Sequence, residues 1–182
     1  MNNKHEIYHD YNRQHPLSDL EIVDDCVVIR SADVYVFGDQ KVKVYGNSTV
    51  NAFGCSEIWA YDDSVVSAND NSEVRAYANS KVTARGNSKV TARGNSKVEA
   101  YNNSKVEAYN NSNVYAYEDS EVRAYANSQI WACDNSKVWA FDNSKVDADD
   151  NSEVTARGNS KVWVFDNSKV DADDNSEVEY IR

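Results

Sequence analysis

Two clusters of aspartates near the C-terminal end of the chain are the main candidates for chemistry. The first cluster is Asp147, Asp149 and Asp150, and the second, further along the chain, is Asp171, Asp173 and Asp174. Carboxylates this close together repel one another unless a cation or a basic partner is present. Three uses are therefore open: a calcium site, a pair of catalytic carboxylates, or an acidic surface that imitates the phosphate row of a nucleic acid.

The first two uses need features that are missing from the sequence. The glycine-rich nonapeptide of calcium-binding β-rolls is absent. A carboxylate-pair hydrolase needs a cleft, which a regular convex repeat surface does not offer. We also find no nucleophile–base pair, phosphate loop or zinc signature. We therefore expect no enzymatic activity, no cofactor and no metal, and the choice lies between an acidic binding surface and a merely solvated one.

A second set of candidates is aromatic, and its members recur in pairs at a constant interval. The pairs are Tyr115 with Tyr117, Trp139 with Phe141, and Trp163 with Phe165. A contiguous stripe of exposed aromatic side chains usually marks a partner surface or a self-association surface. The alternative is that these rings simply stack on the outer face of strands. The arginines in equivalent outward places are expected to make cation–π contacts and cross-strand charge pairs.

All these residues belong to an eight-residue unit, Asn-Ser-x-Val-x-Ala-x-x, that recurs from about residue 47 to the C-terminus; residues 87–94 are a clean copy. The fourth and sixth places are small and apolar, whereas the third, fifth and seventh vary freely. Apolar residues at alternate places predict a strand with one buried face. A helix would need apolar residues three and four places apart.

The residues between these strands predict tight corners. Asp, Gly or Asn, then Asn, then Ser close each unit, and these types tolerate left-handed backbone angles. Corners every eight residues leave no room for crossover helices, so successive strands must wind in one direction. We predict an all-β, single-domain parallel β-solenoid over residues 25–182, with residues 1–24 as an N-terminal arm and cap. Columns of Val, Ala and Ser should form inside, with an Asn ladder through Asn79, Asn87, Asn95 and Asn103.

The number of sides per coil is less directly encoded. Residues 137–160 read Trp-Ala-Phe, Asp-Ala-Asp and Thr-Ala-Arg, and residues 161–176 begin the same cycle again, which favours three sides per coil, one unit to each side. The alternative is a flattened two-sided coil of two units, because Val plus Ala is a thin filling. On the favoured three-sided coil, the two aspartate clusters stack on one face and the aromatic pairs on a neighbouring face. Tyr180 takes the Ala place at the C-terminal end and is expected to plug the core there.

Charge and hydropathy narrow the classes of partner. The net charge of -11 disfavours direct binding to nucleic acid or to an anionic membrane and favours a basic partner surface. No apolar run is long enough to span a membrane, and the polar start does not resemble a signal peptide. We therefore expect a cytoplasmic protein, in a bacterial host.

The repeat in residues 25–182 resembles those of the β-solenoid families, namely hexapeptide left-handed helices, pentapeptide-repeat proteins and bactofilins, although its eight-residue period departs from all three. Acidic pentapeptide-repeat proteins that imitate DNA inhibit topoisomerases, and small anti-CRISPR and anti-restriction proteins use similar electrostatics. The resemblance implies a non-enzymatic inhibitor that occupies the basic nucleic-acid-binding surface of a bacterial enzyme.

Two other functions stay open. The bactofilin resemblance implies a self-assembling scaffold, in which like ends add to one another or two copies form a homodimer through the aromatic face. The other alternative is a carbohydrate- or surface-binding module that uses the exposed Trp and Tyr side chains.

Overall fold

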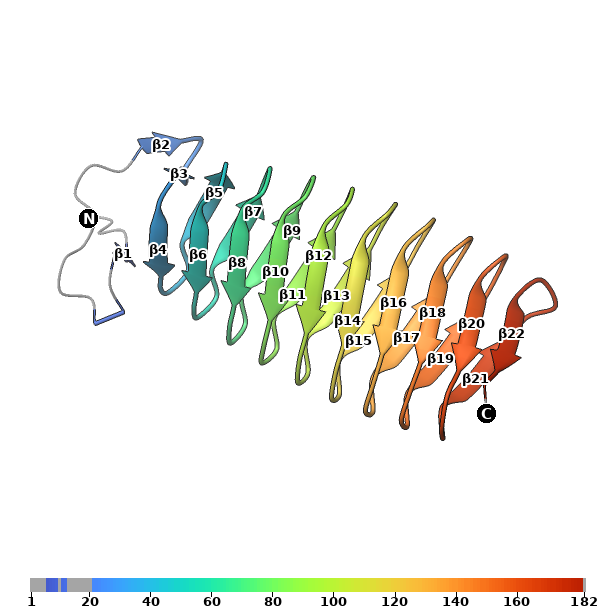
Figure 1. The fold of residues 1–182 in the computed structure, drawn as a ribbon. Coiled ribbons are helices and arrows are strands. Elements are labelled where there is room, and N and C mark those ends of the chain that lie inside the picture. Colours follow the sequence, from blue (N-terminus) through green and yellow to red (C-terminus); the bar gives the residue numbers. More distant parts are fainter. Residues whose placement is uncertain (1–5, 10, 13–20, 182) are drawn as a thin grey trace.

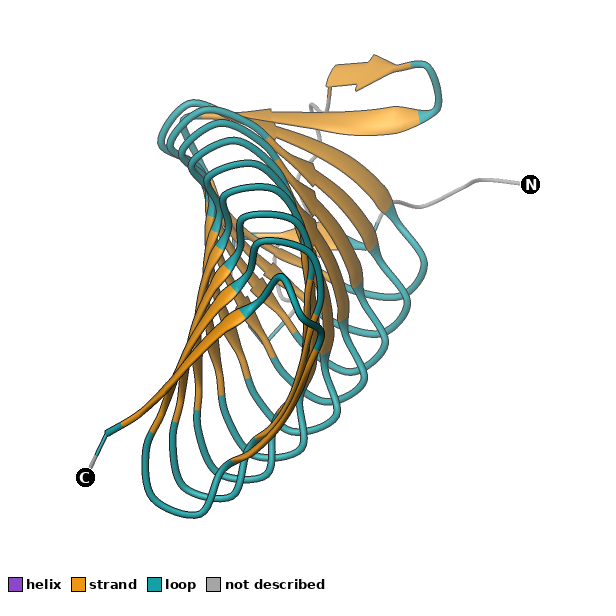
Figure 2. Ribbon diagram, turned by 90° about the vertical axis from the view of Figure 1, so that its right-hand side faces the viewer, coloured by secondary structure: helices purple, strands orange, loops and turns teal. Residues whose placement is uncertain are grey.

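The alternating repeat folds into short parallel strands that wind into a flattened coil (Figure 1). The computed structural model describes residues 6–9, 11–12 and 21–181. Two sheets of 11 strands each face one another and twist along the rod (Figure 2). None of the described residues lies in a helix that is long and apolar enough to cross a membrane.

Sheet A contains one short strand near the N-terminus and every even-numbered strand from β4 onward. In order, these are β1 (Ile7–Tyr8), β4 (Asp33–Val36), β6 (Thr49–Ala52), β8 (Val65–Ala68), β10 (Lys81–Ala84), β12 (Lys97–Ala100), β14 (Asn113–Ala116), β16 (Gln129–Ala132), β18 (Lys145–Ala148), β20 (Lys161–Val164) and β22 (Glu177–Tyr180).

Sheet B contains the remaining strands. In order, these are β2 (Glu21–Val23), β3 (Cys26–Arg30), β5 (Lys41–Tyr45), β7 (Glu57–Ala60), β9 (Glu73–Ala76), β11 (Lys89–Ala92), β13 (Lys105–Ala108), β15 (Glu121–Ala124), β17 (Lys137–Ala140), β19 (Glu153–Ala156) and β21 (Lys169–Ala172).

The register confirms the parallel solenoid and makes the prediction of three sides wrong. Val82 pairs with Val98, and Ala84 with Ala100, so one coil is two eight-residue units. The side chains of the Val and Ala columns are almost all less than 4% exposed. Such small residues fill only the narrow space between two facing sheets, whereas a three-sided prism would need bulkier residues at its centre. The two-sided alternative is therefore the observed coil.

The corners adopt the left-handed backbone that their residue types predict. The first corner residue has a positive φ in nearly every unit, for example 57° at Asp134, 59° at Asp142 and 70° at Gly158. The Ser that closes the corner is fully buried in each unit from Ser48 to Ser160, and in many units its hydroxyl donates to the carbonyl three residues earlier. The expected Asn ladder splits between the two edges of the coil: Asn87 donates to Asn71 at 3.4 Å and Asn79 to Asp63 at 3.4 Å.

The corner serines allow a matched test of this hydrogen bond. Ser144 Oγ donates to the carbonyl of Phe141 at 2.6 Å, whereas Ser136 Oγ is buried and has no hydrogen-bond partner among the described residues. We expect Ser144→Ala to lower the free energy of unfolding by about 1 kcal/mol and Ser136→Ala to leave it nearly unchanged. Chemical denaturation of both variants measures the difference, and equal losses would show that the serine is needed for its shape alone.

The two ends of the rod differ. At the N-terminal end, β1 and β2 pair antiparallel with β4 and β3 and cover the first coil, with Ile7 fully buried. At the C-terminal end, β21 and β22 each have a paired strand on one side only among the described residues. Tyr180 is 67% exposed there. The expectation that Tyr180 plugs the core is therefore wrong, because a residue that plugs the core would be buried between the two sheets.

Candidate acidic and aromatic binding surface

The two aspartate clusters do not stack, because they are three units apart and three units make one and a half coils. Asp147 lies on β18 in sheet A, where its neighbours are Trp131 and Trp163. Asp171 lies on β21 in sheet B, on the opposite face of the rod, beside Thr155. The predicted single acidic face is therefore divided between opposite sides of the molecule.

Two of the three aspartates in the second cluster form ion pairs or hydrogen bonds with other residues of the chain. Arg157 donates to Asp171 at 2.6 Å. Asp173 accepts hydrogen bonds from the backbone N–H of Gly158 at 2.9 Å and the hydroxyl of Ser176 at 2.8 Å. These bonds, the Gly158 N–H above all, lower the pKa of Asp173. Asp171 and Asp173 therefore hold the last coils together, while Asp174 is exposed.

The predicted aromatic stripe divides in the same way. Trp139 lies in sheet B beneath Arg123, whose Cζ is 5.3 Å from the ring centroid. Phe141 follows on the corner, stacked on Tyr125 at 5.1 Å. Tyr117 stacks on Tyr101 at 4.9 Å in the corresponding corners after sheet A. These rings are rungs of ladders, as the alternative interpretation of the aromatic residues predicted.

Sheet A brings together the remaining predicted residues and one that the analysis of the sequence missed. From β14 to β20 the same outward place holds Tyr115, Trp131, Asp147 and Trp163 on successive coils. Tyr115 and Trp131 stack with centroids 4.6 Å apart and planes inclined by 8°. The ladder is then interrupted by Asp147 and resumes at Trp163, whose indole N–H donates to Glu179 at 3.1 Å.

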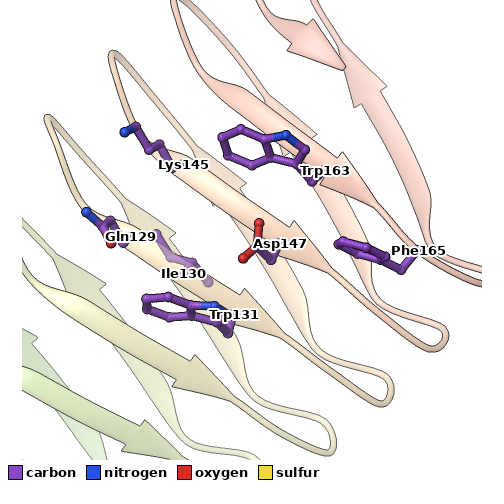
Figure 3. Close-up of a pocket in the computed structure, with 7 residues that line it drawn as sticks. All are labelled: Gln129, Ile130, Trp131, Lys145, Asp147, Trp163 and Phe165. Atoms are coloured by element: carbon purple, nitrogen blue, oxygen red, sulfur yellow. The ribbon is translucent and has the colours of Figure 1, made fainter. Parts of the chain in front are cut away.

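The interruption creates a hollow on the surface of sheet A (Figure 3). Its volume is about 360 Å³, and the two indoles lie on either side of the Asp147 carboxylate. Phe165 borders the hollow towards the next corner, and Lys145 extends away from Asp147 at the other end. We call this hollow the aromatic slot, defined by Trp131, Asp147, Trp163 and Phe165.

A row of carboxylates runs along the edge of the rod beside the slot, in the four corners that follow β14, β16, β18 and β20. These corners, residues 117–120, 133–136, 149–152 and 165–168, contain no basic residue. We call the row the acidic edge; it consists of Glu118, Asp119, Asp134, Asp149, Asp150 and Asp166. Because coils are about 4.8 Å apart, the edge presents one carboxylate per about 3 Å, close to the phosphate spacing along one strand of DNA.

Backbone hydrogen bonds hold most of these carboxylates in place. The N–H of Asn102 donates to Glu118 at 2.8 Å, that of Glu118 to Asp134 at 3.1 Å, and that of Asp134 to Asp150 at 3.3 Å. The N–H of Asp150 donates to Asp149 at 2.8 Å. Each of these four carboxylates thus accepts a hydrogen bond from a backbone N–H in its own coil or in the coil before. The backbone of the solenoid therefore fixes the position of each carboxylate. The row is a rigid array of negative charge.

Comparison with known protein families, with curated proteins and with solved structures finds no match to this chain. The resemblance to pentapeptide-repeat, hexapeptide-repeat and bactofilin proteins is therefore carried by the repeat pattern alone.

The negative charge of the acidic edge raises the pKa of groups that lie within or beside it. The protonated carboxyl of Asp166 donates a hydrogen bond to Asp149, and this bond, together with the charges of Asp149 and Asp150, raises the pKa of Asp166. The carboxylate oxygens of these three residues lie within 4.8 Å of one another. Burial, followed by the charges of Asp149, Asp150 and Asp134, also raises the pKa of the Cys133 thiol. The carboxylates of the acidic edge thus repel one another, and a cationic partner bound there would reduce this repulsion.

We expect Asp166→Asn to raise the melting temperature near pH 7. Because the native pKa of Asp166 lies above the unfolded value, the native state holds this proton more tightly. Stability is therefore lost as the pH rises through the raised pKa, and the amide removes that loss because its NH2 group donates a hydrogen bond to Asp149 at either pH. Thermal melts at about pH 7 and about pH 3 should show the gain only at the higher pH.

Asp39→Asn, at the other end of the rod, changes the net charge equally and is the control. A gain of the same size in both variants would mean that total charge, and not the Asp149–Asp166 contact, sets the effect.

Most of the acidic edge escaped the sequence analysis, although a signal was present. Acidic residues recur at 118, 134, 150 and 166, each two units after the last. That interval gives both the length of the coil and the line along which the carboxylates stack. The recurrence of Trp-x-Phe three units apart was a stronger but misleading signal, because it relates opposite sides of the rod.

Proposed function

We propose that this chain is a non-enzymatic binding protein whose acidic edge occupies the basic nucleic-acid-binding surface of a bacterial enzyme. The observation that carries the proposal is the acidic edge itself, in which six carboxylates in four successive corners give an average charge density close to that along one strand of DNA. A basic groove built for a nucleic-acid strand offers cations at matching intervals. The rigidity of the row adds to the affinity, since little conformational freedom is lost on binding.

The aromatic slot supports the same function from the adjoining surface. Trp131, Trp163 and Phe165 provide flat apolar side chains within the same four coils as the acidic edge. Aromatic side chains are enriched among the residues that dominate binding energy in protein interfaces. The net charge of -11 also disfavours binding to the nucleic acid, so that the enzyme is the partner.

The test is competition with DNA. The protein is immobilised, a bacterial lysate is passed over it at low salt, and proteins released by high salt are identified, since salt screens contacts between exposed charges. A captured topoisomerase, restriction enzyme or RNA-guided nuclease is then purified with its labelled DNA. Displacement of the DNA by this chain is the expected result. A captured protein that keeps its DNA while this chain is bound would contradict the proposal.

Self-association is the second candidate, favoured by the outer edges of β21 and β22, which pair with no further strand within the part of the chain that is described, and by the exposure of Tyr180. At the opposite end β1 and β2 pair antiparallel with β4 and β3, so the two ends are unlike. Pairing of two C-terminal ends would give a closed dimer instead of a filament. Sedimentation at increasing concentration distinguishes these assemblies from a monomer.

A further inference from the structure

The aromatic slot is a gap in a stack of aromatic side chains, at the one coil where the aromatic residue is replaced by Asp147. Along sheet A, Trp131 and Trp163 occupy the same outward place two coils apart, and Asp147 fills the place between them with a short side chain. Two coils separate the indoles by about 9.6 Å. Where aromatic side chains occupy the same place on successive coils, on this strand or in the corners, their ring centroids are 4.6 to 5.2 Å apart. The gap between the indoles therefore has room for one planar group.

The chain's own side chains show which planar group such a place accepts beside an indole. The guanidinium of Arg75 lies over Trp59 at 5.2 Å, and that of Arg123 over Trp139 at 5.3 Å, each one coil away from the ring. Arg75 also pairs with the carboxylate of Glu73 at 2.6 Å. In sheet B, the guanidinium of Arg75 is thus held between the face of an indole and a carboxylate at a place equivalent to the aromatic slot.

Asp147 determines the charge that the slot prefers. Its carboxylate lies between two indoles, and partial burial raises its pKa, although the nearby indole N–H of Trp131 acts in the opposite sense. A carboxylate in this setting gains most from a cation that replaces its lost hydration. A neutral ring could stack between the indoles but would bury the carboxylate further without compensation.

We propose that the aromatic slot binds the guanidinium group of an arginine side chain from a partner protein, stacked between Trp131 and Trp163 with its charge against Asp147. This inference rests on the proposed function, because arginine is abundant on surfaces that bind nucleic acid. It adds a specific contact to the general electrostatics of the acidic edge. A lysine ammonium is a compact charge without flat faces, so it fills the slot less well.

The test uses N-acetyl-L-arginine amide as the probe and the indole N–H resonances of the four tryptophans as the readout. We expect saturable shifts of the Trp131 and Trp163 resonances and none of Trp59 and Trp139, assigned with single Trp→Phe variants. The citrulline analogue has the same shape without the charge, and the lysine analogue has the charge without the plane. Both should bind at least about fivefold more weakly.

Two pairs of variants locate the site. Asp147→Asn should weaken arginine-amide binding about tenfold, whereas Asp171→Asn, with the same charge change on the opposite sheet, should not. Trp163→Thr should abolish the shifts, whereas Trp139→Thr should preserve them; Thr already occupies this outward place at Thr155. Unchanged melting temperatures confirm that each variant is folded. Equal binding of the citrulline analogue, or full binding by Asp147→Asn, would overturn the inference.

This titration involves no partner protein, so its failure is distinct from failure of the proposed function. If the slot does not bind arginine amide but DNA displacement still depends on the acidic edge, only the slot inference is wrong. If the slot binds arginine amide and no enzyme loses its DNA, the inference stands for the slot and the proposed function is wrong.

Discussion

Removing four charges from the acidic edge is expected to lower the affinity for the captured enzyme at least about 100-fold. The substitutions are Glu118→Gln, Asp134→Asn, Asp150→Asn and Asp166→Asn. An amide oxygen still accepts the backbone hydrogen bonds that Glu118, Asp134 and Asp150 receive, so the fold should persist. Loss of about 0.7–1 kcal/mol for each charge contact gives the expected factor. Binding is measured by calorimetry or by DNA displacement.

The control removes the same number of charges from the other edge of the coil, in the corners after sheet B. Its substitutions, all Asp→Asn, are at Asp62, Asp63, Asp142 and Asp174. We expect less than about a fivefold loss, because these carboxylates act on the partner only at a distance and are screened by salt. Equal losses in the two variants would mean that net charge alone attracts the partner, and the acidic edge would not be the site.

Val114→Asp is expected to have the largest effect on stability. Val114 is fully buried in the Val column of sheet A, packed between Val98 and Ile130 of adjoining coils. A carboxylate there would lose its hydration with no cation in reach, at a cost of at least about 4 kcal/mol in the free energy of unfolding. Each coil of a solenoid is stabilised by its neighbours, so the coils around β14 should lose their strand signal together.

Asn113→Asp provides the matched control. It introduces the same carboxylate one residue earlier on β14, where the side chain points outward. Its effect on the free energy of unfolding should stay within about 0.5 kcal/mol. Circular dichroism and chemical denaturation measure both variants. Comparable losses at the two positions would mean that the strand does not separate a buried face from a solvent face as described.

The strand pattern was predictable because it is imposed by local geometry. Successive side chains of a strand point to opposite sides, so the Val and Ala places of each unit had to lie on one face. The corner residues were predictable for a similar reason, since few residue types accept a positive φ. Both features recur in most units from β5 to β22. Ala78, Glu118 and Ala126 also adopt a positive φ in the corner, where the stacking of coils and not the residue type sets the backbone.

The number of sides could not be derived from the buried places. Nearly every unit presents Val, Ala and Ser to the interior. The buried columns would therefore contain the same residue types whether a unit stacks on the second or on the third unit after it. Only the outward places differ between the two arrangements, and these tolerate many residue types because they face solvent. Stacked tyrosines such as Tyr61 on Tyr77, at 5.1 Å, show the interval of two units once the coil is known.

The sequence by itself determined an acidic, all-β chain of stacked parallel strands, because strand alternation and corner chemistry act within eight residues. The tertiary structure alone decided which outward residues are neighbours, because stacking joins residues two units apart through the pairing of whole coils. It placed Asp171 and Asp147 on different sheets, and it placed Trp131 and Trp163 two coils apart on the same sheet. It also aligned four acidic residues on one edge: Glu118, Asp134, Asp150 and Asp166. Both the acidic edge and the aromatic slot therefore follow from the width of the coil, which is set by how little space Val and Ala fill between two sheets.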